Sequence, residues 1–203
     1  LLNKHNGFRK FHNRQWSLDL FKSNYKPLMV GQVNGNEFSK RSDKFLWTMD
    51  LPIKMPFSDI RVPDEFEQFR EFIEKAYTHE VICNPNVHNW YAYLCIDQRQ
   101  VLPMSTQRRP GAHADSFPTG NVHMNRLSDS VYLAYDCLPT EFCNGNFTFE
   151  PSINTNINKE IISHFENKTN DVHTYPDYHI IKMDSGHVHQ VGFNKTANPI
   201  DRT

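Results

Sequence analysis

A histidine and an aspartate two residues apart, His113 and Asp115, restrict the fold of this chain more than any other feature. On a β-strand both side chains would point to the same face, because side chains alternate with a period of two. Two further histidines, His187 and His189, follow more than seventy residues later. Both segments can reach one ion only if their strands line the same cavity. The pattern therefore favours a β-barrel with a metal site inside it.

Short segments with strand-like alternation cover much of the chain. Between residues 89 and 100, Tyr91 and Tyr93 alternate with Ala92 and Leu94, which predicts a strand with two distinct faces. The N-terminal part is predicted to form short strands joined by turns. We expect further strands at 130–136, around 147–149, at 179–183 and at 187–193.

A single stretch has helical periodicity, from residue 64 to about residue 79. Its apolar residues recur at intervals of three and four: Phe66, Phe69, Phe72, Ile73 and Tyr77. Asp64 and Glu67 have the spacing of a capping box, and Asn84 with Pro85 marks the end of the predicted helix. By contrast, the segment 142–158 is rich in Asn, Thr and Pro, which predicts an exposed loop or lid.

These elements predict one domain of mainly β structure with a few helices. Many short strands and one helix are typical of a double-stranded β-helix, the jelly-roll barrel. The 203 residues are enough for a single core. We expect residues 1 to about 88 to form a supporting N-terminal segment and residues 89–203 to form the barrel core.

Composition gives limited information about partners and compartment. The formal net charge of -1 gives no indication of nucleic-acid binding, and no apolar run reaches the roughly 20 residues of a membrane span. The four cysteines, Cys83, Cys95, Cys137 and Cys143, contain no C-x-x-C pair. We expect free thiols in a reducing compartment, and so a soluble cytoplasmic protein.

The candidate metal ligands are two imidazoles and one carboxylate. His113, Asp115 and one distal histidine would leave three adjacent positions open on an octahedral metal, the arrangement of non-haem Fe(II) sites. Because His187 and His189 would share one strand face, either can be the distal ligand, and we favour His189. Alternatively both bind as an H-x-H pair, and Asp115 then lies outside the ligand set.

The order of these residues resembles the Fe(II)- and 2-oxoglutarate-dependent oxygenases. The resemblance rests on His113, Asp115 and His189, followed by Arg202. It covers about the C-terminal half of the chain and implies Fe(II) and 2-oxoglutarate as cofactors, with dioxygen as cosubstrate. The implied reaction is hydroxylation of a small molecule, an amino acid or a peptide side chain.

The resemblance also implies roles for residues around the metal. Arg202 would form an ion pair with the distal carboxylate of 2-oxoglutarate, which a planar guanidinium fits well. Tyr91 and Tyr93 would line the cavity and donate to the same cosubstrate. Arg108 and Arg109, just before the metal pair, would lie at the mouth of the barrel and can attract an anionic group.

Two other classes of protein fit the same pattern. A cupin-type metalloprotein would use His187 and His189 without 2-oxoglutarate. A binding or structural jelly-roll module would have incidental histidines and no tight metal site. Binding of 2-oxoglutarate and of metal separates the three hypotheses.

Overall fold

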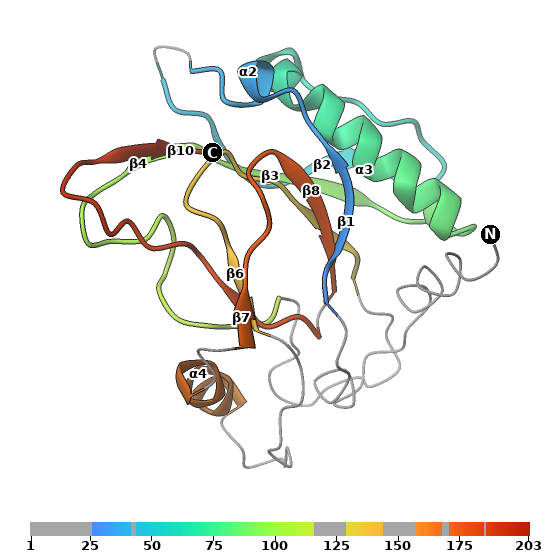
Figure 1. Cartoon of the computed structure of the whole chain (residues 1–203). Helices are drawn as coiled ribbons and strands as arrows, with labels where there is room; N and C mark the ends of the chain where they lie inside the picture. The colour runs from blue at the N-terminus through green and yellow to red at the C-terminus, as the bar shows by residue number, and fades with distance from the viewer. Residues whose placement is uncertain (1–25, 42–43, 116–128, 144–156, 168–170, 185) are drawn as a thin grey trace.

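The computed structural model describes residues 26–41, 44–115, 129–143, 157–167, 171–184 and 186–203 (Figure 1). These residues form antiparallel strands in four small sheets, together with three α-helices and two 3-10 helices. The predicted mainly β class with few helices is confirmed. The described strands do not close into a barrel, so the double-stranded β-helix stays a prediction.

Strands make up most of the described elements, and the helices are interspersed among them. The strands are β1 (Leu28–Gln32), β2 (Trp47–Lys54), β3 (Ala92–Asp97), β4 (Arg99–Val101), β5 (Val131–Leu133), β6 (Glu141–Cys143), β7 (Val172–His173), β8 (His179–Met183), β9 (His189–Gln190) and β10 (Ile200–Arg202). The helices are α2 (Gly35–Phe38), the 3-10 helix η2 (Asp64–Phe69), α3 (Arg70–Cys83), the 3-10 helix η3 (Val87–Asn89) and α4 (Ile157–Asn167).

Strands that are distant in sequence pair within each sheet. The sheets have the orders β1-β8-β5, β2-β3, β10-β4 and β7-β6-β9, and every pairing is antiparallel. Strands β1 and β2 belong to the predicted supporting segment, yet they pair with β8 and β3. Residues before 88 therefore complete the sheets formed by the later part of the chain.

Helix α3 lies alongside β1 and covers the main hydrophobic core (Figure 1). This core joins the apolar face of the helix to the inward-facing residues of β3, because Leu94 and Ile96 are buried while Tyr93 and Cys95 are exposed. The buried members of the core include Val33, Phe38, Ile53, Phe66, Phe69, Ile73, Ala76, Leu94, Ile96 and Ile180. Strand β3 thus has the two distinct faces that were predicted: an apolar face toward α3 and a more exposed face on the other side.

The predicted helix is present, but its start differs from the expectation. Residues Asp64–Phe69 form a 3-10 helix, and Phe66 leaves helical geometry at φ -111° and ψ 15°. No side-chain hydrogen bond caps this helix at Pro63 or the next one at Phe69, so the predicted capping box is wrong. The end is as expected, since Asn84 is extended, as a residue before proline prefers.

The strand and loop predictions are confirmed in part. The strand at 179–183 matches β8, whereas the strand expected over 187–193 is limited to His189–Gln190. The lid predicted over 142–158 is wrong at its first residue, because Phe142 is fully buried in β6. Helix α4 begins at Ile157, within the predicted lid, and residues 144–156, with the strand expected near 147–149, lie outside the described residues.

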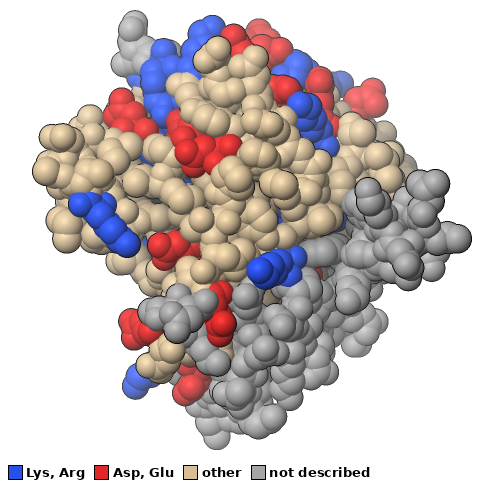
Figure 2. All heavy atoms as spheres, in the orientation of Figure 1, with Lys and Arg blue, Asp and Glu red and all other residues tan. Residues whose placement is uncertain are grey.

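The surface shows no segregation of charge on the face drawn in Figure 2. Lys and Arg side chains are interspersed there with Asp and Glu side chains. Among the described helices there is none with the length and apolar character that a membrane span requires.

Candidate metal centre

His113 and His189 lie directly opposite each other on two antiparallel segments. The amide of His113 donates to the carbonyl of His189, and the amide of His189 donates to the carbonyl of His113, both at 2.9 Å. Residues paired in this way place their side chains on the same side of the sheet. The imidazole centroids are accordingly 4.6 Å apart. Backbone pairing therefore brings the first and the distal predicted ligand together.

Asp115 completes the group from the same side. Its Oδ1 lies 3.7 Å from Nε2 of His113, and its Oδ2 lies 3.6 Å from Nε2 of His189. The three ligand atoms lie within 4.8 Å of one another, and the group can hold a metal ion. Adjacent ligands bound at about 2.1 Å would be roughly 3 Å apart, so only small movements are needed to bind an ion.

Backbone carbonyls fix both imidazole rings. Nδ1 of His113 lies 3.1 Å from the carbonyl of Gly111, and Nδ1 of His189 lies 3.0 Å from the carbonyl of His187. A carbonyl can only accept, so each Nδ1 carries a proton, and the neutral form of each ring then has its lone pair on Nε2. Metal-binding histidines usually have such a hydrogen bond on the other ring nitrogen.

The ligands differ in their exposure to solvent. His189 is buried, with 7% of its side chain exposed, whereas His113 and Asp115 are half-buried. Burial lowers the pKa of His189, although the Asp115 carboxylate opposes this effect. His189 is therefore neutral near pH 7, which is the form that binds a metal.

His187 lies outside the group, although the alternation rule allowed it as a ligand. Its Nδ1 is 3.0 Å from Oδ1 of Asp184, and its amide donates to the carbonyl of Asp184 in a turn. Strand β9 begins only at His189, so the period of two does not extend back to His187. Among the described residues, the group that could hold a metal ion contains His189 and not His187.

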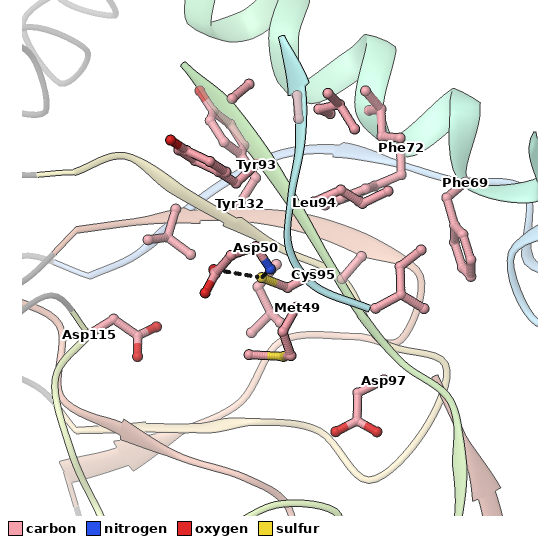
Figure 3. A pocket seen from close by; sticks show the side chains of 18 of the residues that line it. Met49, Asp50, Phe69, Phe72, Tyr93, Leu94, Cys95, Asp97, Asp115 and Tyr132 are labelled. Atoms are coloured by element: carbon pink, nitrogen blue, oxygen red, sulfur yellow. Dashed lines mark hydrogen bonds between the residues drawn. The ribbon is translucent and has the colours of Figure 1, made fainter. Parts of the chain in front are cut away.

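A cavity of about 1440 Å³ connects this group with the other predicted residues. His113, Asp115, His189 and Arg202 all line it. Figure 3 shows part of its wall, where Asp115 and Tyr93 belong to different segments of the chain. Its remaining wall includes apolar residues of β3 and α3.

Tyr91 and Tyr93 line the same cavity, and each is a little more than half exposed, at 55% and 56%. Their rings stack with centroids 5.9 Å apart and an interplanar angle of 18°. Arg108 and Arg109 also line the cavity, and Arg108 forms an ion pair with Asp97 at 3.1 Å. The positive charge of the arginines expected at the mouth of the cavity is therefore partly neutralised.

Arg202 is deeply buried, with 3% exposed, and its guanidinium contacts neutral groups. Nε donates to the carbonyl of Cys137 at 2.9 Å, one terminal nitrogen donates to Oε1 of Gln107, and the other donates to Thr140 Oγ1 at 3.4 Å. The guanidinium also lies over the Tyr135 ring, 5.7 Å from its centroid. Burial lowers the pKa of Arg202, but an arginine stays charged at neutral pH.

Gln107 and Thr140 were not predicted as members of the site. Gln107 lies in the run before His113, next to the two arginines that suggested an anion-binding rim, and its neutral side chain gave no reason to select it. Thr140 had no sequence pattern that distinguishes it from other threonines. Both can be found only from the pairing of distant strands.

Comparison of the chain with protein-family models, with curated proteins and with solved structures gives no match.

Proposed function

We propose that the protein is a non-haem Fe(II)- and 2-oxoglutarate-dependent dioxygenase that hydroxylates a small molecule, an amino acid or a peptide side chain. The observation that carries this proposal is the group of His113, Asp115 and His189. Two imidazoles with fixed Nε2 atoms and one carboxylate form the ligand set typical of Fe(II) oxygenases. The pairing of His113 with His189 is also what two facing strands of a double-stranded β-helix would produce.

Arg202 supports 2-oxoglutarate as the cosubstrate. It is a buried cation that lines the cavity of the metal group, and among the described residues it forms no ion pair with a carboxylate. A buried charge without a counter-ion is costly, so an anionic ligand would stabilise this arrangement. In this proposal the two carboxylates of one ligand bind the metal and the guanidinium, which line the same cavity.

The protein's residues have separate tasks in this proposal. His113, Asp115 and His189 would hold the metal through two imidazole nitrogens and one carboxylate. Arg202 orients the cosubstrate, and the apolar wall restricts water. Bound Fe(II) supplies the oxidising chemistry, in which substrate, 2-oxoglutarate and dioxygen give hydroxylated substrate, succinate and carbon dioxide.

The cupin-type alternative has less support from the geometry, because His187 contacts Asp184 and is not a member of the group. A module without a metal site is the other alternative. It offers no reason for Gly111 and His187 carbonyls to orient two imidazoles toward one carboxylate.

The test is an anaerobic titration of the purified protein with Fe(II) and 2-oxoglutarate. We expect a weak visible charge-transfer band in the wild type, and its loss in Asp115→Ala and His189→Ala. His88→Ala is a matched control, because His88 is exposed and is not a member of the group. Metal binding without the band would contradict the role of 2-oxoglutarate as cosubstrate. Absence of metal binding would contradict the whole proposal.

A further inference from the structure

Among the described residues Arg202 forms no ion pair with a carboxylate, although the charges of Asp97, Asp136 and Asp177 act on the guanidinium. Asp97 pairs with Arg99 at 2.6 Å and with Arg108 at 3.1 Å. Asp136 pairs with Arg41 at 2.7 Å and accepts from the amide of Thr203 at 2.8 Å. Asp97 and Asp136 thus have other cationic partners, and the guanidinium is held by a carbonyl, an amide and a hydroxyl.

Gln107 connects the guanidinium to the rest of the site. Its side chain is buried, with 6% of the residue exposed. Its Nε2 donates to the carbonyl of Asp97 at the end of β3, and its Oε1 accepts from Arg202 on β10. Gln107 also precedes His113 by six positions in the chain. One neutral side chain thus links two strands that line the cavity with the segment that leads to the metal group.

Neutrality is the property that makes a glutamine suitable at this position. A guanidinium has five N–H donors, and three of them have partners among the described residues. One N–H on each terminal nitrogen is left for a carboxylate to accept. A glutamate at position 107 would accept the same hydrogen bond but would neutralise the cation before a ligand arrives.

We propose that Gln107 is the positioning residue of the anion subsite, and that it orients Arg202 without neutralising its charge. The subsite then binds the distal carboxylate of the 2-oxo acid. This inference rests on the proposed function. The preference for a dicarboxylate over a monocarboxylate of the same length then comes from the charge of Arg202, which a neutral residue at position 107 leaves available.

The test compares Gln107→Glu with the wild type, using 2-oxoglutarate and 2-oxopentanoate, which lacks the distal carboxylate. We expect Gln107→Glu to weaken 2-oxoglutarate binding at least about tenfold, because the guanidinium already has an anionic partner. Affinity for 2-oxopentanoate should not change, so the preference between the two acids should collapse. Affinity for Fe(II) alone should also be unchanged, which shows that the metal group is intact.

Two further variants separate charge from folding. Gln32→Glu is the matched control, since Gln32 is exposed on β1 and the same substitution there should leave both affinities unchanged. Gln107→Met keeps the volume and the neutral charge but removes the hydrogen bonds. It should raise the KM for 2-oxoglutarate and leave kcat nearly unchanged, while the preference for the dicarboxylate is retained.

If Gln107→Glu does not fold, Gln107→Met decides alone, and an unchanged KM would overturn the inference. A folded Gln107→Glu protein that still prefers 2-oxoglutarate would also overturn it, while leaving the proposed function standing. A wild type that binds Fe(II) but neither 2-oxo acid would instead refute the proposed function, and the inference with it.

Discussion

At the scale of single residues, the metal group depends on a short turn before His113. Gly111 has φ +103°, a backbone conformation that side chains with a Cβ rarely adopt. Its carbonyl is the acceptor that fixes the His113 ring. The sequence showed the Pro110 and Gly111 pair, but the role of the glycine carbonyl followed only from the structure.

Gly111→Ala should therefore weaken metal binding more than it disturbs packing. A Cβ at this position would be 3.8 Å from Ile162 Cδ1, an ordinary contact, so the cost is conformational, about 1 to 2 kcal/mol. Relief of that strain would move the carbonyl that orients His113. Calorimetric metal titration should show a lower affinity than wild type. Gly31→Ala is the control, because its φ is not positive and its Cβ would have an ordinary 3.6 Å contact. Equal metal affinity in wild type and Gly111→Ala would contradict this role.

At the scale of elements, a buried ion pair joins helix α3 to strand β8. Nζ of Lys182 lies 2.7 Å from Oε2 of Glu80, and the two side chains are 1% and 9% exposed. Tyr132 donates to the same oxygen at 2.6 Å, while Asn84 and Ser130 donate to Oε1 at 3.2 Å. Both carboxylate oxygens therefore accept hydrogen bonds, and the cluster fixes the helix on the sheet.

Glu80→Gln should destabilise the fold by about 3 to 5 kcal/mol, because it leaves Lys182 buried without a counter-ion. Adding Lys182→Met should recover part of that loss. Glu74→Gln on the same helix is the control, since Glu74 is exposed and should change stability by less than about 0.5 kcal/mol. Urea unfolding measures all four proteins. A Glu80→Gln loss as small as that of Glu74→Gln would refute the argument.

The same pair predicts a pH dependence. Burial alone would raise the pKa of Glu80, but the Lys182 charge and the hydrogen bonds to the carboxylate together hold it below its usual value. The stability that the ionised Glu80 contributes is therefore fully present above the pKa of about 4.3 that a glutamate has in the unfolded chain. It is lost as the pH falls through the lower pKa that Glu80 has in the folded protein. Urea unfolding between pH 7 and pH 3 should show an acid-dependent loss of stability that is smaller in Glu80→Gln. The prediction would be contradicted if the free energy of unfolding fell equally with pH in the wild type and in Glu80→Gln.

The elements also show which parts of this fold can be predicted from sequence. Phe69, Ile73 and Ala76 are buried and are spaced four and three residues apart, as residues on one helix face are. Helix α3 could therefore be predicted from the sequence. Helix α4 was missed because its neighbourhood is rich in polar residues, although Ile161 and Phe165, four apart and buried, were a usable pattern. Alternation could not choose between His187 and His189, because the choice depends on where β9 begins.

At the scale of the whole molecule, the metal group joins parts of the chain that are far apart in sequence. His113 and Asp115 come from the segment after β4, and His189 comes from β9, which pairs with β6. A hydrogen bond from Arg202 on β10 to Gln107 also joins the segment after β4 to the C-terminal part of the chain. The unfolded chain has no such preformed site, so metal binding should favour the folded state.

Metal should therefore raise the thermal stability of the whole chain. At a metal concentration about 100 times Kd, linkage gives about 2.7 kcal/mol, a rise in Tm on the order of 5 to 10 °C for this length. Scanning calorimetry with and without Mn(II) measures the shift, and His88→Ala should keep it. An equal shift in Asp115→Ala would show that metal stabilises the protein from another place.

One metal ion is expected to bind between His113, Asp115 and His189. The most direct measurement is a crystal structure of the protein with Mn(II), with an anomalous difference map at the manganese edge. We predict one strong peak about 2.0 to 2.3 Å from Nε2 of both histidines and from a carboxylate oxygen of Asp115. A peak held by His187 and His189 without Asp115, or no peak at this group, would contradict the account.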